Sequence, residues 1–76
     1  MKPIHTDYPS LVKEVRQQLG LSQEDLAREL GVSYATVNRW ENAQARPSKL
    51  ARAQLDAFCE RMQTAGMLSL SETDRG

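Results

Sequence analysis

The sequence predicts an all-α domain, a compact bundle of four to five helices. Apolar residues recur at helical spacing in four successive segments, and a residue suited to begin a helix stands near the start of each. No stretch alternates apolar and polar residues over a useful length, apart from residues 67–70. The chain has 76 residues, 39% of them hydrophobic and 26% charged, which is enough for one modest core and too short for two domains.

Capping signals predict the first two helices. The first is expected over residues 9–19, with Gly20 after its last turn. The second should begin at Ser22, which forms the capping pattern Ser-x-x-Asp with Asp25, and should end at Gly31. Their apolar positions are Leu11, Val12, Val15 and Leu19, then Leu26, Ala27 and Leu30.

The third and fourth helices follow the same logic. Ser33 should open the third helix, which ends near Asn42, and Pro47 and Ser48 favour a new helix that runs to about Thr64. The apolar stripe of this longest helix is Ala51, Leu55, Phe58 and Met62. The chain is therefore divided into an N-terminal arm (residues 1–8), a helical domain (residues 9–64) and a C-terminal tail (residues 65–76).

Charge is balanced over the whole chain and uneven along it. Ten basic and ten acidic residues give a net charge of zero, so any surface for nucleic acid must be local. Residues 33–54 carry four basic residues against Glu41 alone, a net charge of +3, whereas residues 11–32 carry −1 and residues 55–76 carry −2. The positive field therefore lies on the third helix and the segment after it.

Several functional classes find no support in the sequence. Cys59 is the only cysteine and His5 the only histidine, so neither an internal disulfide nor a four-ligand His/Cys metal site can form within one chain. Cys59 is most simply a small, partly buried residue, with a dimer contact or a redox-sensitive thiol as alternatives. Without an export signal, a membrane span, a phosphate-binding loop or a nucleophile motif, we expect a cytoplasmic protein that is not an enzyme and needs no cofactor.

Residues 21–42 join two short helices through a tight turn, which is the pattern of a helix-turn-helix. Ala27 is small where the two helices should cross, and Gly31 can adopt the left-handed conformation that the turn needs. The outer face of the third helix should then remain exposed. The side chains at the spacing that projects into a major groove are Tyr34, Ala35, Asn38 and Arg39.

This segment resembles the helix-turn-helix of the phage lambda repressor and Cro proteins, also called the xenobiotic-response-element type. The resemblance spans roughly residues 9–60 and implies binding of operator DNA, generally by a two-fold dimer. The residues that carry it are Ser22-Gln23, Leu26-Ala27, Gly31-Val32-Ser33, Val37, Trp40-Glu41-Asn42 and Arg46-Pro47-Ser48.

The resemblance also implies a role for individual residues. The four exposed residues of the third helix would contact base edges, Arg39 foremost, because a guanidinium that pairs with guanine gives about 1–3 kcal/mol of discrimination. Gln23 would brace the recognition helix and bind the DNA backbone near a helix N-terminus. An ion pair would join Arg16 to Glu41. The residues expected at the DNA backbone are Gln23, Ser33, Thr36, Asn42 and Arg46.

One position departs from the family pattern. The family usually has glycine after Glu-Asn, where this chain has Ala43. If that residue needs a positive φ, alanine costs about 1 kcal/mol there.

Trp40, Tyr34 and Arg39 each have a simpler interpretation than contact with DNA. Trp40 could stack on a base, but Val37 three residues earlier places it on the inward face, and a core position is favoured. Tyr34 could be a plain surface aromatic and Arg39 a solvated charge. Their place on the exposed face favours contact with DNA for both.

The apolar stripe of the fourth helix is longer than the rest of the domain can cover. The surplus predicts the interface of a homodimer, as expected of proteins that bind two half-sites. The residues of this predicted interface are Phe58, Met62, Met67, Leu68 and Leu70.

The sequence therefore predicts a protein that binds double-stranded DNA in a sequence-specific manner. We expect it to be a transcriptional repressor that acts by occupying a promoter. An alternative is an antitoxin or other protein-interaction module whose acidic C-terminal segment binds a toxin or another partner protein. A third possibility keeps the fold but has lost DNA binding. No membrane association is expected in any of these cases.

Overall fold

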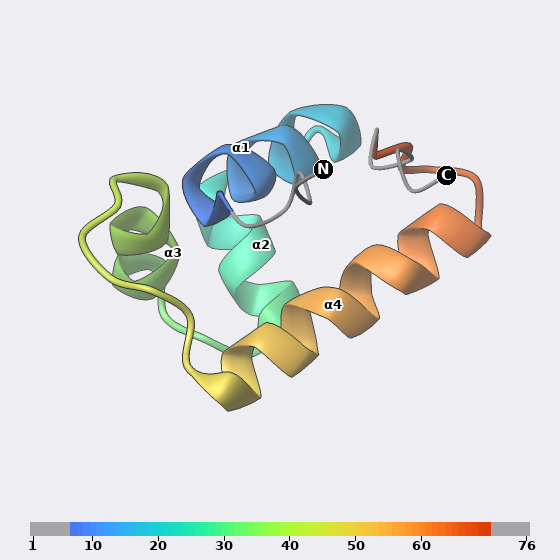
Figure 1. The fold of residues 1–76 in the computed structure, drawn as a ribbon. Helices are drawn as coiled ribbons and strands as arrows, with labels where there is room; N and C mark the ends of the chain where they lie inside the picture. The colour runs from blue at the N-terminus through green and yellow to red at the C-terminus, as the bar shows by residue number, and fades with distance from the viewer. Residues whose placement is uncertain (1–6, 71–76) are drawn as a thin grey trace.

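Four helices form the domain (Figure 1). A computed structural model describes residues 7–70, and the helices are α1 (Tyr8–Leu19), α2 (Gln23–Leu30), α3 (Tyr34–Glu41) and α4 (Lys49–Thr64). No strand occurs within these 64 residues, so the predicted all-α class is confirmed with four helices. The outer parts of the expected arm and tail, residues 1–6 and 71–76, including His5, lie outside the described residues.

The helices enclose one apolar core. In Figure 1, α1 and α4 lie on opposite sides of α2, and α3 packs beside α1 and α2 at one end of the molecule. The side chain of Trp40 is buried in this core, which confirms its interpretation as a packing residue. The buried apolar residues are Leu11, Val12, Val15, Leu26, Ala27, Leu30, Val37, Trp40, Ala51, Leu55, Phe58, Cys59 and Leu68.

A side-chain oxygen caps the N-terminus of every helix. Ser22, Ser33 and Ser48 each accept a hydrogen bond from the backbone N–H three residues later, and Ser22 with Asp25 forms the full capping box. Asp7 plays the same part for α1, because it accepts from the Ser10 backbone N–H. Helix α1 therefore begins at Tyr8, one residue before the predicted start.

The two short helices of the motif end in the same way. After α2, the N–H of Gly31 donates to the Arg28 carbonyl and that of Val32 to the Ala27 carbonyl, with Gly31 at φ 75°. After α3 the same two-bond pattern recurs around Ala43, whose φ is 58°. Alanine thus occupies a left-handed position that normally favours glycine.

The packed body extends beyond α4. Leu68 is only 5% exposed and belongs to the core, while its neighbour Met67 is 60% exposed. The Gln18 side chain fixes this segment to α1: its Nε2 donates to the Ser69 carbonyl at 2.7 Å, and its Oε1 accepts from the Ser69 N–H at 2.8 Å. Residues 67–70 are therefore part of the folded domain.

The described residues contain neither a membrane-spanning helix nor a cluster of metal-ligating side chains. None of the four helices is long and apolar enough to cross a membrane. Across residues 7–70 there is also no group of three or more His, Cys, Asp or Glu side chains placed to hold a metal ion.

Candidate nucleic-acid interface

Helix α3 has one buried and one exposed face. Val37 and Trp40 point into the core, which fixes the rotation of the helix and leaves the other side in solvent. On that side Tyr34 is 51% exposed, Ala35 and Arg39 are exposed, and Asn38 is half-buried. A helix held in this way can enter a major groove without disturbing the core.

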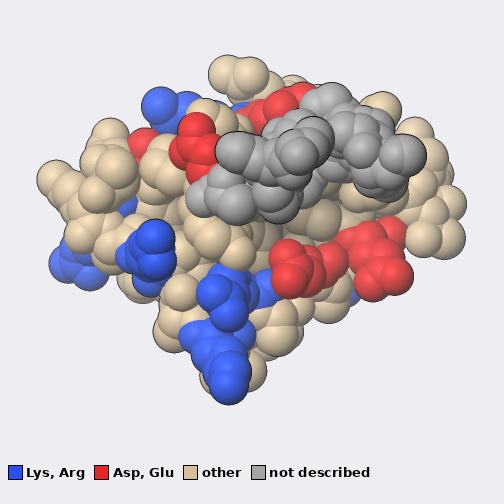
Figure 2. Space-filling view, viewed as in Figure 1, with Lys and Arg blue, Asp and Glu red and all other residues tan. Residues whose placement is uncertain are grey.

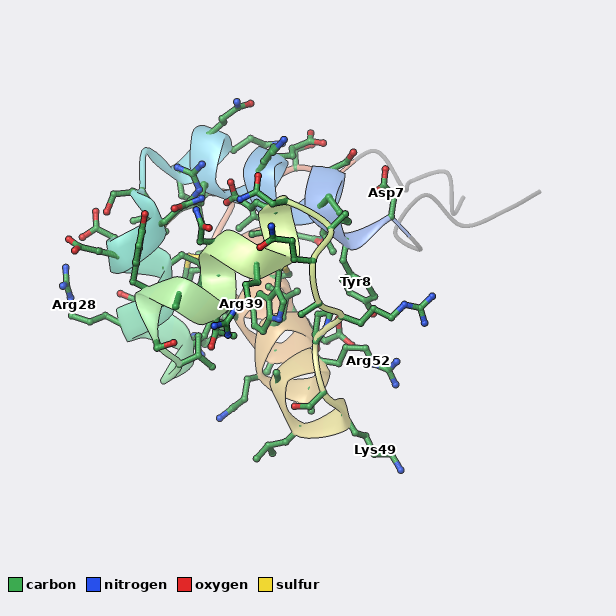
Figure 3. The ribbon with its side chains drawn as sticks, turned by 90° about the vertical axis from the view of Figure 1, so that its left-hand side faces the viewer. Asp7, Tyr8, Arg28, Arg39, Lys49 and Arg52 are labelled. Atoms are coloured by element: carbon green, nitrogen blue, oxygen red, sulfur yellow. The ribbon has the colours of Figure 1, made fainter. Side chains whose placement is uncertain are left out.

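Basic side chains surround the exposed face of α3. Figure 3 shows Arg39 on α3 between Arg28 on one side and Lys49 and Arg52 on the other. Arg46, in the loop before α4, is exposed as well. Lys49 and Arg52 were predicted only as part of a basic stretch, and the fold brings them to the same end of the molecule as Arg39.

On the face drawn in Figure 2 the acidic side chains lie mainly away from this basic end, whereas on α2 Asp25 pairs with Arg28 at 2.6 Å. Figure 2 shows blue side chains gathered towards α3 and the start of α4, and red ones over the later part of α4 and over α1. Glu41 is the one acidic residue of residues 33–54, and it is buried. The solvent-exposed charge of this segment is therefore wholly positive, more so than its net charge indicates.

Glu41, the last residue of α3, forms an ion pair with Arg16. Arg16 donates from Nε to Oε2 at 2.6 Å and from a terminal nitrogen to Oε1 at 2.9 Å, and the Gln23 amide donates to Oε1 at 3.0 Å. The carboxylate side chain is 3% exposed and the guanidinium side chain 23%. This two-point contact ties α1 to the C-terminal end of α3.

Electrostatics keep both partners charged. Burial alone would raise the pKa of Glu41, but hydrogen bonds from Arg16 and Gln23 and the charges of Arg16 and Lys13 outweigh it, so the pKa lies below its ordinary value. The hydrogen bond to Glu41 raises the pKa of Arg16 despite partial burial. Glu41 is therefore an ionised carboxylate, which can accept hydrogen bonds but not donate them.

Three side-chain amides form a series of hydrogen bonds that begins at Glu41. Asn38 donates from Nδ2 to the Gln23 Oε1 at 3.2 Å. Asn42 donates from Nδ2 to the Asn38 Oδ1 at 3.2 Å and to the Asn38 backbone carbonyl at 3.0 Å. Gln23, Asn38 and Asn42, which we call the amide network, are thus joined through hydrogen bonds.

The other residues expected at the DNA backbone lie apart from this network. The hydroxyls of Ser33 and Thr36 are 2.8 Å from each other at the first turn of α3. Arg46 lines an open hollow of about 470 Å³ between the start of α1 and the loop after α3. Tyr8 and Ala43 also border this hollow, and the sequence patterns did not indicate Tyr8.

The comparison with known protein families agrees with this geometry. A helix-turn-helix family model matches residues 12–51, more than half of the chain. No curated protein and no solved structure matches the chain. The matched residues include α2, the turn and α3 in full, together with the Glu41 ion pair and the loop that carries Arg46. The chain therefore belongs to the lambda repressor and XRE-like helix-turn-helix family and is a DNA-binding transcriptional regulator.

Proposed function

We propose that the protein is a transcriptional repressor that recognises an operator in double-stranded DNA with α3 in the major groove. The observation that carries the proposal is that the exposed face of α3 and exposed basic side chains lie at the same end of the molecule. These basic side chains include those of the next loop and of α4, and the segment's single carboxylate is buried. Base contacts and phosphate contacts can therefore be made together.

The residues on this surface suit different contacts. Arg39 can pair with a guanine, whereas Tyr34 and Ala35 offer a ring and a methyl group to base edges. Asn38 completes the predicted base-contacting set, although its amide is bonded to two neighbouring side chains. Phosphate contacts are proposed for Gln23, Ser33, Thr36, Asn42 and Arg46.

Repression by occupancy requires only this surface. A protein that covers a promoter competes with other proteins for the same DNA, whereas activation needs a second surface for the transcription machinery. We therefore propose repression.

A two-fold dimer is the proposed DNA-binding form. Its half-sites would lie about one helical turn, roughly 34–36 Å, apart. Of the five residues predicted for the interface, Phe58 and Leu68 fill the core of their own protomer. Met62, Met67 and Leu70 are at least partly exposed beside them, and we propose the contact there.

The antitoxin alternative needs the C-terminal segment to be available to a partner protein. In the structure, Leu68 is buried and Ser69 is bonded to Gln18, so residues 67–70 already have a binding site on α1 and in the core. This intramolecular packing favours the operator-binding function over a partner-binding tail.

Selection from a random duplex pool tests the proposal. DNA retained by the protein at about 150 mM salt is sequenced, and we expect an inverted repeat with half-sites one helical turn apart. In the same selection, Arg39→Ala should relax the preference at one position in each half-site, because the other base contacts remain. Retention without a motif, by a protein with native helicity, would rule out operator recognition.

A further inference from the structure

We propose that Glu41 sets the direction of the amide network, so that Gln23 and Asn38 turn N–H donors rather than oxygens towards the DNA backbone. Asn38 is then a positioning residue with a phosphate contact, and it does not contribute to base specificity. The inference rests on the proposed DNA-binding function and changes the part that Asn38 plays in it.

The direction follows from the chemistry of a carboxylate. Glu41 has no proton to give, so the Gln23 side chain must present its Nε2 to it, at 3.0 Å. The Gln23 oxygen then faces Asn38, whose Nδ2 must donate to it, at 3.2 Å. Each amide along the network therefore has one orientation, and the reversed arrangement would set two oxygens against each other.

The two-point contact with Arg16 fixes the orientation of the Glu41 carboxylate, where the network begins. Both Glu41 oxygens accept from the guanidinium, so the carboxylate cannot rotate without losing a short charged hydrogen bond. Together with the ion pair, the network connects α1 with the first residue of α2 and the last turn of α3. A change of charge at Glu41 should therefore reach Asn38, which has no hydrogen bond to it.

The amide hydrogens that the network leaves unbonded are suited to donate to a phosphate. Gln23 Nε2 and Asn38 Nδ2 each carry two hydrogens, and the hydrogen bonds among residues 7–70 use one on each. Phosphate oxygens only accept, so two fixed donors are complementary to a DNA backbone. Both side chains are half-buried, at the border between the core and the exposed face of α3. The two-point contact by which an asparagine reads adenine needs its oxygen as well as its nitrogen, so the Asn38 oxygen would have to give up its bond from Asn42.

Nuclear magnetic resonance of the free protein tests the network without DNA. The side-chain amide signals of Gln23, Asn38 and Asn42 are compared between wild type, Glu41→Gln and the control Glu29→Gln, which changes an exposed carboxylate of α2. We expect the Asn38 signal to shift in Glu41→Gln and to stay in place in Glu29→Gln. An unmoved Asn38 signal overturns the inference, whatever the DNA experiments give. If Glu41→Gln does not fold, Gln23→Ala is used instead, and the signal to follow is that of Asn42, which is bonded to Asn38 and not to Gln23. An unmoved Asn42 signal would then overturn the inference.

Operator selection with Asn38→Ala tests the role in DNA binding. We expect the wild-type motif at every position, with affinity about tenfold lower for all operators, because one hydrogen bond to a charged phosphate is lost. Gln23→Ala and Asn38→Ala together should cost less than the sum of the two separate losses. A relaxed base preference in Asn38→Ala would make it a base-contacting residue and overturn the inference. Failure of the proposed function is distinguishable, since wild type itself would then yield no motif.

Discussion

The two partners of the buried ion pair differ in their exposure to water. Removing one should therefore cost more free energy of unfolding than removing the other. Arg16→Ala leaves a carboxylate that is 3% exposed without its counter-charge, whereas Glu41→Ala leaves a guanidinium that is 23% exposed. We expect Arg16→Ala to lower the free energy of unfolding by about 3 kcal/mol and Glu41→Ala by clearly less. Urea unfolding of both variants measures the difference. Equal losses would mean that the burial of Glu41 is not what makes the pair costly to break.

The same carboxylate should make stability depend on pH in the acid range. Folding lowers the pKa of Glu41 from its ordinary value of 4.5, so its contribution is fully present above that value and is lost as the pH falls through the lower value of the folded state. Glu41→Gln cannot titrate at this position. Thermal melts from pH 7 downwards should show the difference between wild type and this variant shrinking below pH 4.5. A constant difference would contradict the lowered pKa.

Ala43 is a position where the natural residue is not the most stable one. Its φ of 58° is unfavourable for a residue with a Cβ atom. We expect Ala43→Gly to raise the free energy of unfolding by about 1 kcal/mol. Ala45→Gly in the same loop is the matched control, since Ala45 has no positive φ, and it should not stabilise. If both variants melt together, the conformation of residue 43 has no measurable cost.

At the scale of single residues, the sequence predicted the partners of charged side chains better than those of side-chain amides. The Arg16 and Glu41 pairing is implied by a family resemblance, and an unpaired buried charge would be strongly disfavoured. The bonds of Asn38 could not be predicted in the same way. An asparagine side chain can bond in many directions, and its partner Gln23 lies on another helix, 15 residues away.

At the scale of the helices, local signals account for most of the observed ends. Ser22, Ser33 and Ser48 cap where the sequence predicts, because a cap is a contact within four residues. The start of α1 was predicted one residue late, because Pro9 suits the first helical turn and the cap is Asp7. Burial of Leu68 depends on contact with distant helices, which local signals do not contain.

The segment after α4 should depend on one glutamine. Gln18→Ala removes both hydrogen bonds to the Ser69 backbone, so the Ser69 amide should exchange with solvent faster while global stability falls by no more than about 1 kcal/mol. Hydrogen exchange followed by nuclear magnetic resonance measures this directly. Gln17→Ala, a neighbouring exposed glutamine, is the control and should leave Ser69 unchanged. Unchanged exchange in Gln18→Ala would show that Leu68 holds the segment alone.

At the scale of the whole molecule, a neutral chain presents a basic end. The sequence predicts this from its uneven charge, and the fold strengthens it by burying Glu41 on the inner face of α3. The location of Lys49 and Arg52 at the same end of the molecule as Arg39 depends on how α4 packs, so sequence spacing alone could not predict it. Association with DNA should therefore be strongly dependent on salt.

The salt dependence can be stated in numbers. If each protomer of a dimer contacts about three to four phosphates, a plot of log affinity against log salt should have a slope near −6. Arg46→Ala should make the slope less steep by about 1 for each protomer. Arg61→Ala is the control, because Arg61 lies over the Phe58 ring on the second half of α4 and should leave the slope unchanged. A slope near zero for wild type would contradict binding to the DNA backbone.

The reactivity of the buried Cys59 thiol can report how often α4 separates from the core. Burial, and then the charge of Asp56, raises the pKa of this thiol to about 11, so little thiolate exists in the folded state at neutral pH. A thiol reagent can react with Cys59 only when α4 has separated from the core. The chain has no second cysteine, so all labelling occurs at this position. The labelling rate then reports how often that helix opens, in unmodified protein and with DNA present or absent.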